Sequence, residues 1–291
     1  MDGTKVYPID WQSEEHADGE IWSAALWNIY RAIGGDSANA AERLAARDAL
    51  LKTLILSHHM LAANASMPDG AEAVMNTDAA LPEYRGRRLR EMLDSFHARG
   101  LLRSEAGVDL WMKDEANDDG ANQSGALFED SPDLWIRNTD DNGALHQNPE
   151  SGQDNWFYAR VRNRGVRAAR AFVVTFNVKS FFAGTQFVYP FDWTPFISAS
   201  VGYNLASGAA VVLKARWPRA LVPPVGTGAR WLASVYTPLD AAPAGSHAWE
   251  HNNLAVKSLS IVDHLAGNNA PSAQPAAAPP FGASDEMQRF V

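Results

Sequence analysis

The sequence has 291 residues, a formal net charge of −9 and a pI of about 5.3. Its length allows two domains, and a hydrophobic content of 46% is usual for a globular protein. We take the basic residues to be scattered, so the charge argues against nucleic acid or an anionic membrane surface as the main partner. The absence of cysteine excludes disulfides and thiolate chemistry.

The first hundred residues show the periodicity of helices. Trp22, Leu26, Ile29 and Ile33 recur at helical spacing in a segment over 16–33, where we expect Asp18 to accept from the first-turn N–H groups. Further helices are predicted over 40–62, with Leu44, Leu51 and Ile55 on the buried line, over 71–80 and over 89–96. Residues 1–112 are therefore predicted to form an all-α domain.

The next segment differs in composition. Residues 113–131 carry acidic side chains among Gly, Asn and Ser, with little to bury. We therefore predict an acidic, solvated linker and a domain boundary here.

From residue 132 the apolar period changes to two. Phe157, Ala159 and Val161 alternate with polar residues, and a second run over 172–178 follows the turn at Asn163-Arg164-Gly165, which predicts a hairpin. Further strands are predicted at 209–216, 230–236 and 254–262. We expect residues 132–265 to form an antiparallel β-sandwich and 266–291 a flexible Ala/Pro-rich tail. The fold class is thus a multidomain α and β protein, with an N-terminal helical domain and a C-terminal sandwich.

Several segments of the helical region resemble fungalysin-type zinc metallopeptidases, distant relatives of thermolysin. They are His16-Ala-Asp-Gly-Glu-Ile-Trp22 with Leu26-Trp27, Ser57-His58-His59, Asp69-Gly70-Ala71 and Phe96-His97-Ala98-Arg99-Gly100. The resemblance implies that this region is similar to the C-terminal lobe of such enzymes. By the same resemblance His16 is an oxyanion-stabilising residue, and an upstream carboxylate, Asp10 in preference to Glu14 or Glu15, orients it. The alternative is a hydrogen-bonded surface histidine without chemistry.

No His-Glu-x-x-His motif occurs in this sequence, so no metal ligand is assigned and zinc is expected only if a partner chain completes the site. Adjacent His58 and His59 point about 100° apart on a helix and do not readily share an ion. His247-Ala-Trp-Glu-His251 matches the inverted zinc-peptidase pattern, but its flanking residues predict a loop rather than a helix.

The predicted sandwich carries a second resemblance. Ser131–Arg137, Gln153–Gly165 and His251–Ala255 resemble the immunoglobulin-like CARDB domains of bacterial surface and secreted proteins. This resemblance implies a fold more than a function.

A dense aromatic run lies between Phe181 and Tyr203. If it is exposed, Phe187, Tyr189 and Trp193 are candidate binding residues for a glycan or a protein. We favour the alternative that most of the run is buried, because such dense aromatics rarely stay in water.

These observations predict a catalytically incomplete, metallopeptidase-derived protein, a pseudoenzyme acting as a binding or assembly component and inactive alone. The alternatives are one piece of an active secreted zinc endopeptidase whose His-Glu-x-x-His segment lies on another chain, and a structural component of the cell surface. Family resemblance implies an extracellular or cell-surface location, although this chain shows no signal peptide and no apolar run that could span a membrane. We expect a protein partner, with a glycan or surface ligand for the sandwich as a further candidate.

Overall fold

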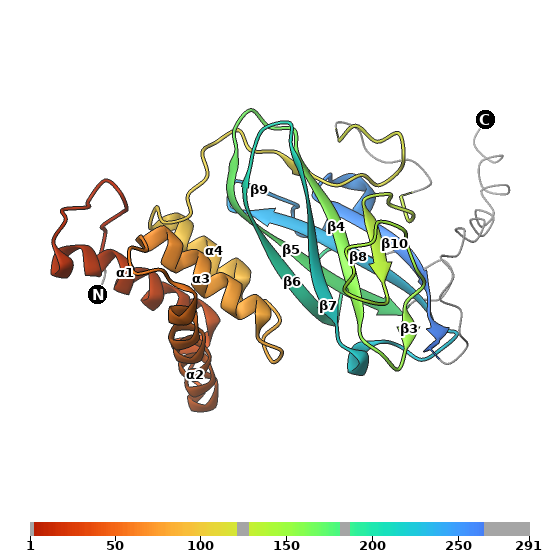
Figure 1. The fold of residues 1–291 in the computed structure, drawn as a ribbon, viewed down its shortest axis with the longest axis horizontal. Helices are drawn as coiled ribbons and strands as arrows, with labels where there is room; N and C mark the ends of the chain where they lie inside the picture. The colour runs from red at the N-terminus through yellow and green to blue at the C-terminus, as the bar shows by residue number, and fades with distance from the viewer. Residues whose placement is uncertain (1–2, 121–127, 181–186, 265–291) are drawn as a thin grey trace.

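Figure 1 shows two parts of the chain side by side, a group of helices from the N-terminal third and a β-sandwich from the rest. The structure is a computed structural model that describes residues 3–120, 128–180 and 187–264. The helices are α1 (Glu15–Tyr30), α2 (Ala40–Ser57), α3 (Met67–Ala80) and α4 (Leu89–Ala98). A π-helical turn, Arg31–Gly35, follows α1, and a 3₁₀ turn, His58–Met60, follows α2. Helices therefore occupy all four predicted positions.

The start of α1 differs from the prediction. Glu14, not Asp18, caps the helix, because its side chain accepts a hydrogen bond from Ala17 N at 2.6 Å. Asp18 is buried and turns back to accept from the backbone N–H groups of Gln12 and Glu14. It therefore fixes the incoming loop rather than the first turn.

Helix α3 begins earlier than predicted. Ser66 and Asp69 form a reciprocal capping box, and Pro68 sits in the first turn, where its missing N–H costs nothing. Pro68-Asp69-Gly70 therefore belongs to the first turn of the helix, ahead of the predicted start at residue 71.

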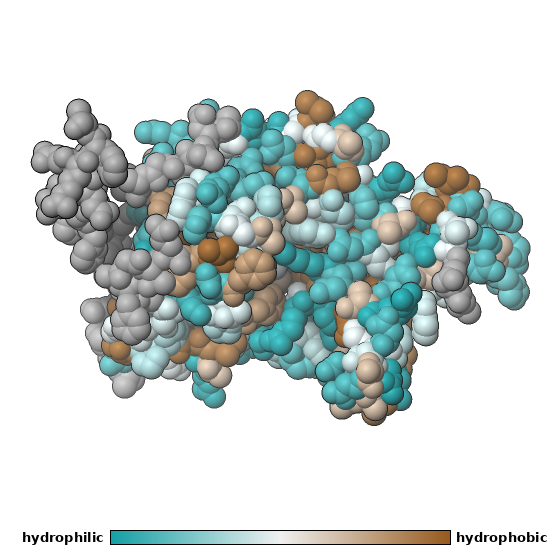
Figure 2. Space-filling view, turned by 180° about the vertical axis from the view of Figure 1, so that it is seen from behind, coloured by the Kyte–Doolittle hydropathy of each residue, from teal (hydrophilic) through white to brown (hydrophobic). Residues whose placement is uncertain are grey.

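The buried face of α2 is not the predicted one. Leu44, Leu51 and Ile55 are exposed, whereas the buried face consists of small residues and one leucine, Ala46, Ala49, Leu50, Thr53 and Ser57. Both sets have helical spacing, and the smaller side chains allow closer packing against α3. In Figure 2 apolar residues accordingly appear among polar ones on the projecting α2.

The sandwich consists of two antiparallel sheets. Sheet A has β4 (Asn155–Asn163) at its centre, paired with β7 (Ala210–Trp217) and with the short strands β1 (Leu110–Trp111) and β2 (Leu134–Arg137). Sheet B has the order β10-β8-β5-β6, and β9 pairs with the end of β8. Its strands are β5 (Ala169–Ser180), β6 (Phe196–Leu205), β8 (Gly228–Thr237), β9 (Asp240–Ala241) and β10 (Leu254–Ser260). A parallel pair of β3 (Glu150–Ser151) and β11 (Val262–Asp263) lies apart from both sheets.

The predicted hairpin of residues 157–161 and 172–178 is wrong. These segments belong to β4 and β5, which lie in different sheets, and Phe157 stacks on Phe176 across the core with ring centroids 5.2 Å apart. Alternating apolar residues indicate one buried face, but they do not distinguish strands that pair edge to edge from strands that face each other. The chain changes sheet at Asn163, whose side-chain amide donates to Arg167 O and Leu205 O.

The helices do not bury their apolar faces among themselves alone. Residues of α1, α3 and α4 share one hydrophobic cluster with Ala171, Val173 and Ala199 on the outer face of sheet B. The helices therefore cover the outer face of the first part of β5. Whether the helical part and the sandwich are separable domains stays a prediction.

Two predicted boundaries shift. The sandwich already begins at β1, inside the range 1–112 assigned to helices, and Asp114 of the predicted linker is buried. Lys113 N donates to Asp133 at 2.9 Å, so the first part of this segment lies against the sandwich rather than in solvent. Linker residues 121–127 and the predicted tail 266–291 lie outside the described residues.

Across the three described ranges, the structure contains no helix with the length and apolar character that crossing a bilayer requires.

Candidate functional site

His16 lies at the surface of the first turn of α1. Its side chain is 86% exposed, and its Nδ1 lies 3.0 Å from Glu14 Oε1. Asp10 instead accepts a hydrogen bond from Val6 N at 2.7 Å. Glu14 is therefore the carboxylate beside His16, and the preference for Asp10 does not fit this geometry.

The other histidine patterns also lie in turns. His58 and His59 belong to the exposed 3₁₀ turn after α2. His247 precedes a short 3₁₀ turn, Ala248–Glu250, stacks on Trp249 and donates through Nδ1 to Phe187 O at 3.2 Å. Within the described part of the chain, no group of three or more His, Asp or Glu side chains is placed to hold a metal ion.

A cleft of about 190 Å³ lies between the start of α4 and the loop before β6. Its lining residues come from these two segments and from β5 beneath them: Gly86, Arg87, Arg90, Glu91, Thr175, Asn177, Tyr189, Pro190, Trp193 and Phe196. Two of the three predicted binding residues, Tyr189 and Trp193, are therefore in the wall of the cleft. Phe187 packs behind Trp193, with ring centroids 5.1 Å apart.

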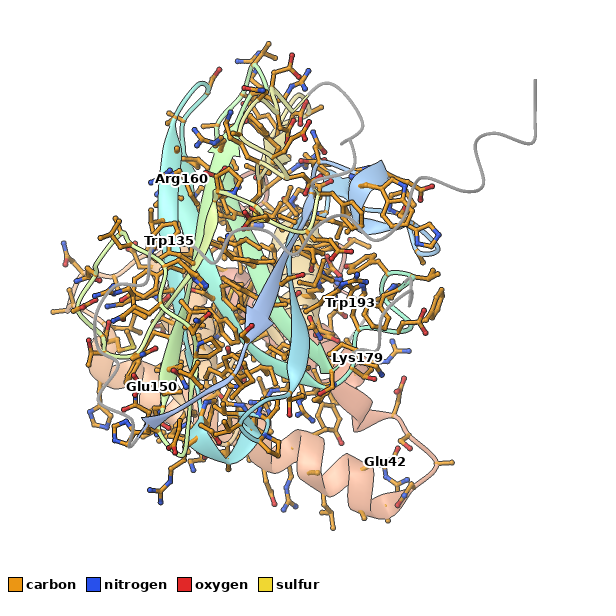
Figure 3. All side chains as sticks on the ribbon, turned by 90° about the vertical axis from the view of Figure 1, so that its right-hand side faces the viewer. Glu42, Trp135, Glu150, Arg160, Lys179 and Trp193 are labelled. Carbon is orange, nitrogen blue, oxygen red and sulfur yellow. The ribbon has the colours of Figure 1, made fainter. Side chains whose placement is uncertain are left out.

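Strand β5 provides the floor of the cleft because its side chains alternate. Val174 and Phe176 point into the sandwich core, which leaves Thr175 and Asn177 on the outer face, beyond the area that the helices cover. The pairing of β5 with β6 shifts between Phe176 and Asn177, an irregularity of the kind that re-aims side chains beside sites. Figure 3 shows Lys179, farther along the same face, on the same side of the sandwich as Trp193.

The aromatic wall is held by backbone contacts. Tyr189 N donates to Ser246 O at 2.8 Å, and Gly245 N donates to Tyr189 O at 2.7 Å. Asn177 donates to Trp193 O at 2.8 Å, which ties the loop to the floor. The expectation that the aromatic run is mostly buried holds for Phe187, Tyr189 and Trp193, whereas Phe191 is exposed; Phe181 and Phe182 lie outside the described residues.

The opposite wall carries arginines that the sequence analysis overlooked. Arg90 donates to Ser234 Oγ at 2.9 Å, and its guanidinium lies 4.8 Å from the Tyr236 ring centre and 5.8 Å from that of Tyr189. The exposed Arg87 lies over the Phe196 ring at 5.6 Å. The signal was the segment Arg85-Gly-Arg-Arg-Leu-Arg90, a cluster of cations in an acidic protein. The basic residues are therefore not all scattered.

Three buried polar atoms of cleft residues have no hydrogen-bond partner within the described part of the chain. They are Arg90 Nε, Glu91 Oε2 and the indole Nε1 of Trp193. Trp193 is only 4% exposed. Burial raises the pKa of Glu91 above its ordinary value. An unpartnered buried polar group destabilises a protein by about 1–3 kcal/mol, and none of these atoms is open to solvent, so a ligand would remove that cost by displacing the atoms that cover them.

The outer face of sheet A also combines arginine, carboxylate and aromatic side chains. Trp135 stacks on Tyr158, and Arg160 lies over Trp135 at 5.5 Å. Arg162 makes two hydrogen bonds of 2.9 Å to the buried Asp133. Figure 3 shows Trp135 and Arg160 on the side of the sandwich opposite Trp193.

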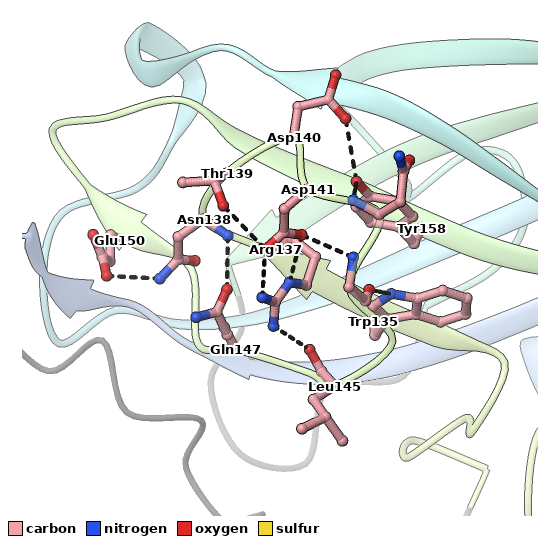
Figure 4. A network of polar contacts seen from close by, with 12 residues as sticks. Trp135, Arg137, Asn138, Thr139, Asp140, Asp141, Leu145, Gln147, Glu150 and Tyr158 are labelled. Carbon is pink, nitrogen blue, oxygen red and sulfur yellow. Dashed lines mark hydrogen bonds and ion pairs between the residues drawn. The ribbon is translucent and has the colours of Figure 1, made fainter.

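The loop after β2 continues this network. In Figure 4 Arg137 lies between the carboxylate of Asp141 and Leu145 O, which accepts at 2.8 Å. His146, in the same loop, accepts from Ile136 N at 3.1 Å through Nδ1, and burial lowers its pKa to about 4. The cations of this face therefore have carboxylate partners, and the arrangement fastens loops to the sheet.

A second hollow of about 310 Å³ lies between the π-helical turn and α2. Its charged residues already have partners, since Arg88 pairs with the buried Asp78 and Glu42 accepts from Ser37 Oγ at 2.6 Å. It is therefore a weaker candidate than the cleft at α4.

The comparisons with known proteins identify no family. No protein-family model matches the sequence, and no curated protein matches it. Among solved structures the chain is similar to the CARDB domain of a Pyrococcus furiosus protein in complex with di-metal ions, with 16% identity, 45% of this chain and 91% of that chain covered, and a TM-score of 0.27. Nothing in these comparisons supports the fungalysin-type resemblance of the first hundred residues.

The chain is also similar to two β-glucosidases, from Listeria innocua in complex with glucose and from Thermotoga neapolitana in complex with α-D-glucose. The identities are 9% and 14%, the shares of this chain are 44% and 45%, and the TM-scores are 0.27 and 0.26. This chain covers 16% of the length of each. Similarity of this extent transfers no activity and no ligand to this chain.

Proposed function

We propose that this chain is a binding module whose ligand site is the cleft between α4 and the aromatic loop. The observation that carries the proposal is the gathering of three unpartnered buried polar atoms, on Arg90, Glu91 and Trp193, at one cleft. Because most buried polar groups in native proteins are hydrogen-bonded, such groups need an explanation, and a missing ligand supplies one for all three.

The position of the cleft supports the same proposal. Its floor is a regular strand, and both of its walls are tied to the sheet by hydrogen bonds from Arg90 and Asn177. A site on rigid elements holds its polar groups in place before a ligand arrives, which lowers the entropy that binding costs.

The remaining expectations also stay proposals. Descent from a metallopeptidase, an extracellular location, a protein partner and zinc supplied through another chain rest on the fungalysin-type resemblance of the helical region. His16 is exposed and does not line the cleft, so the binding proposal does not depend on that descent.

Ligand-induced stabilisation of the full chain tests the proposal. A library of small acids, amino acids and sugars is screened by thermal unfolding, since a ligand at a hundred times its Kd stabilises the folded state by about 2.7 kcal/mol. Compounds that stabilise the chain are then titrated into wild type, Trp193→Phe and the control Phe191→Ser. Phe191 lies in the same loop but is exposed and does not line the cleft.

We expect Trp193→Phe, which keeps a six-membered aromatic ring but removes the pyrrole ring with its N–H, to weaken binding while Phe191→Ser leaves it unchanged. A screen without any stabilising compound, or equal binding by wild type and Trp193→Phe, would overturn the proposal.

A further inference from the structure

The charges around the cleft are unequal. Two guanidinium groups, of Arg87 and Arg90, face one carboxyl group, that of Glu91. Arg87 is exposed, and the described residues offer it a ring contact with Phe196 but no ion pair. In a chain with a net charge of −9 this is a local excess of positive charge, which favours an anionic group on the ligand.

The donors of the cleft suit a carboxylate. Within the described residues Arg90 Nε and Trp193 Nε1 are N–H donors without a partner, and Arg87 adds a planar guanidinium, which matches the two oxygens of a carboxylate. The Asn177 side-chain amide adds a neutral group at the floor, and its one hydrogen bond to a described residue goes to Trp193 O.

Glu91 imposes a further requirement. Its Oε2 is buried with no hydrogen-bond partner in the ranges that the structure describes, and in its ionised form a carboxylate only accepts hydrogen bonds. A ligand that carried nothing but negative charge would leave this oxygen unpartnered beside a like charge. The ligand must therefore also carry a hydrogen-bond donor, a hydroxyl or an ammonium group.

The size of the cleft limits the rest of the ligand. Its volume of about 190 Å³ is below the range of roughly 300–1,000 Å³ that is usual for drug-sized ligands. Tyr189 and Trp193 provide apolar surface for a compact hydrocarbon body. A single ring or a small amino acid fits these limits, and a longer molecule would insert only its end.

We infer that the cleft binds a small carboxylate with a hydroxyl or ammonium donor a few bonds away, an inference that rests on the proposed function. Two sources share this chemistry, a uronic acid at the end of an acidic polysaccharide and a free α-amino acid. Arg87 and Arg90 take the carboxylate, Glu91 accepts from the donor, and Tyr189 with Trp193 covers the body.

Isothermal titration of the full chain with four probes tests the inference. Glucuronate is paired with glucose, and phenylalanine with phenylalaninamide, so that each pair differs at the carboxylate. We expect at least one of the two acids to bind about tenfold more tightly than its neutral partner, since hydrogen bonds to charged groups contribute about 1.5–3 kcal/mol.

Two variants assign the groups. Arg87→Gln should weaken binding of the acid about tenfold, whereas Arg47→Gln, which removes an exposed arginine on α2, should leave it unchanged. Glu91→Gln should weaken the binding of an ammonium ligand more than that of a hydroxyl ligand, because a charged donor loses more binding energy when the carboxylate is removed. This difference identifies the source of the ligand.

The outcomes separate this inference from the proposed function. Equal affinity for acid and neutral probes, or equal effects of Arg87→Gln and Arg47→Gln, would overturn the carboxylate inference. If Trp193→Phe still weakened the neutral probes in that case, the cleft would remain the binding site. If none of the four probes binds while another compound of the library does, the inference is wrong and the proposed function stands.

Discussion

The same side-chain types, arginine beside aromatic rings and carboxyl groups, occur on the outer face of sheet A and in the cleft on the outer face of sheet B. Their roles in the two places differ. On sheet A, Arg162 makes two hydrogen bonds to Asp133, and Arg137 is paired with Asp141. In the cleft, Arg87 and Arg90 have ring contacts but no ion pair with a carboxylate among the described residues. Ion pairing of the arginines therefore distinguishes the network that holds loops from the candidate ligand site, which residue composition alone would not show.

The largest expected effect concerns the aromatic wall. Trp193→Ala removes a packed, buried aromatic side chain and should lower the free energy of unfolding by about 3–5 kcal/mol. Trp193→Phe should cost less, about 1–2 kcal/mol, because it removes only the pyrrole part of the packed ring system and an N–H without a partner among the described residues. Denaturant unfolding measures both. A loss in Trp193→Phe as large as that in Trp193→Ala would contradict an N–H without a partner in the free protein, because most of the packed aromatic surface is kept.

A smaller loss is expected on sheet A. Asp133→Ala should lower the free energy of unfolding by about 3 kcal/mol, because it removes the buried partner of Arg162 and of Lys113 N. The more exposed pair of Asp154 with Arg216 provides the control, and Asp154→Ala should cost about 1 kcal/mol or less. Equal losses in the two variants would contradict a structural role for the Asp133 network.

The pH dependence of stability tests the loop after β2. The pKa of His146 falls from 6.5 to about 4 in the folded protein, so the unfolded chain takes up the proton first as the pH falls. Its contribution is therefore complete above about pH 6.5 and is lost between about 6.5 and 4, by about 3.5 kcal/mol in total at about 1.4 kcal/mol per pKa unit. Urea unfolding at several pH values should show this loss in wild type and much less of it in His146→Gln.

The smallest effect is expected at Phe191, which is 69% exposed. Phe191→Ser should change the free energy of unfolding by no more than about 0.5 kcal/mol, as surface substitutions usually do. Thermal unfolding of Phe191→Ser and Trp193→Ala under the same conditions would show that position within the aromatic loop, rather than residue type, decides the loss of stability. A substantial loss would mean that this ring packs against something in solution.

Local pattern predicted the elements better than their partners. Helical spacing located the four helices, and alternation located β4, β5, β7, β8 and β10. The same alternation suggested the wrong pairing for β4, because Phe157 faces a strand of the opposite sheet. Likewise, α2 has two faces with helical spacing, one with Leu44 and Leu51 and one with alanines. Only tertiary packing decides which of the two faces is buried.

The candidate site was half predictable. Aromatic density drew attention to Tyr189 and Trp193, whereas Arg87, Arg90 and Glu91 lie about a hundred residues earlier and reach the cleft only because α4 packs on sheet B. The run of arginines before α4 was visible in the sequence. The sequence could not show which of these arginines reaches the cleft, because Arg88 pairs with a buried carboxylate while its neighbour Arg87 lines the cleft.

Strand β7 has a consequence for the behaviour of the protein at high concentration. Among the described residues it pairs with β4 alone, so its other edge offers unpaired backbone groups that could template a strand from another molecule. Lys214 and Arg216 alternate along its outward side and keep this edge hydrated, which makes such pairing costly. The ion pairs that fasten neighbouring loops to sheet A thus also protect the chain from aggregation, and neutralising these two residues would favour insoluble assemblies even where each molecule stays folded.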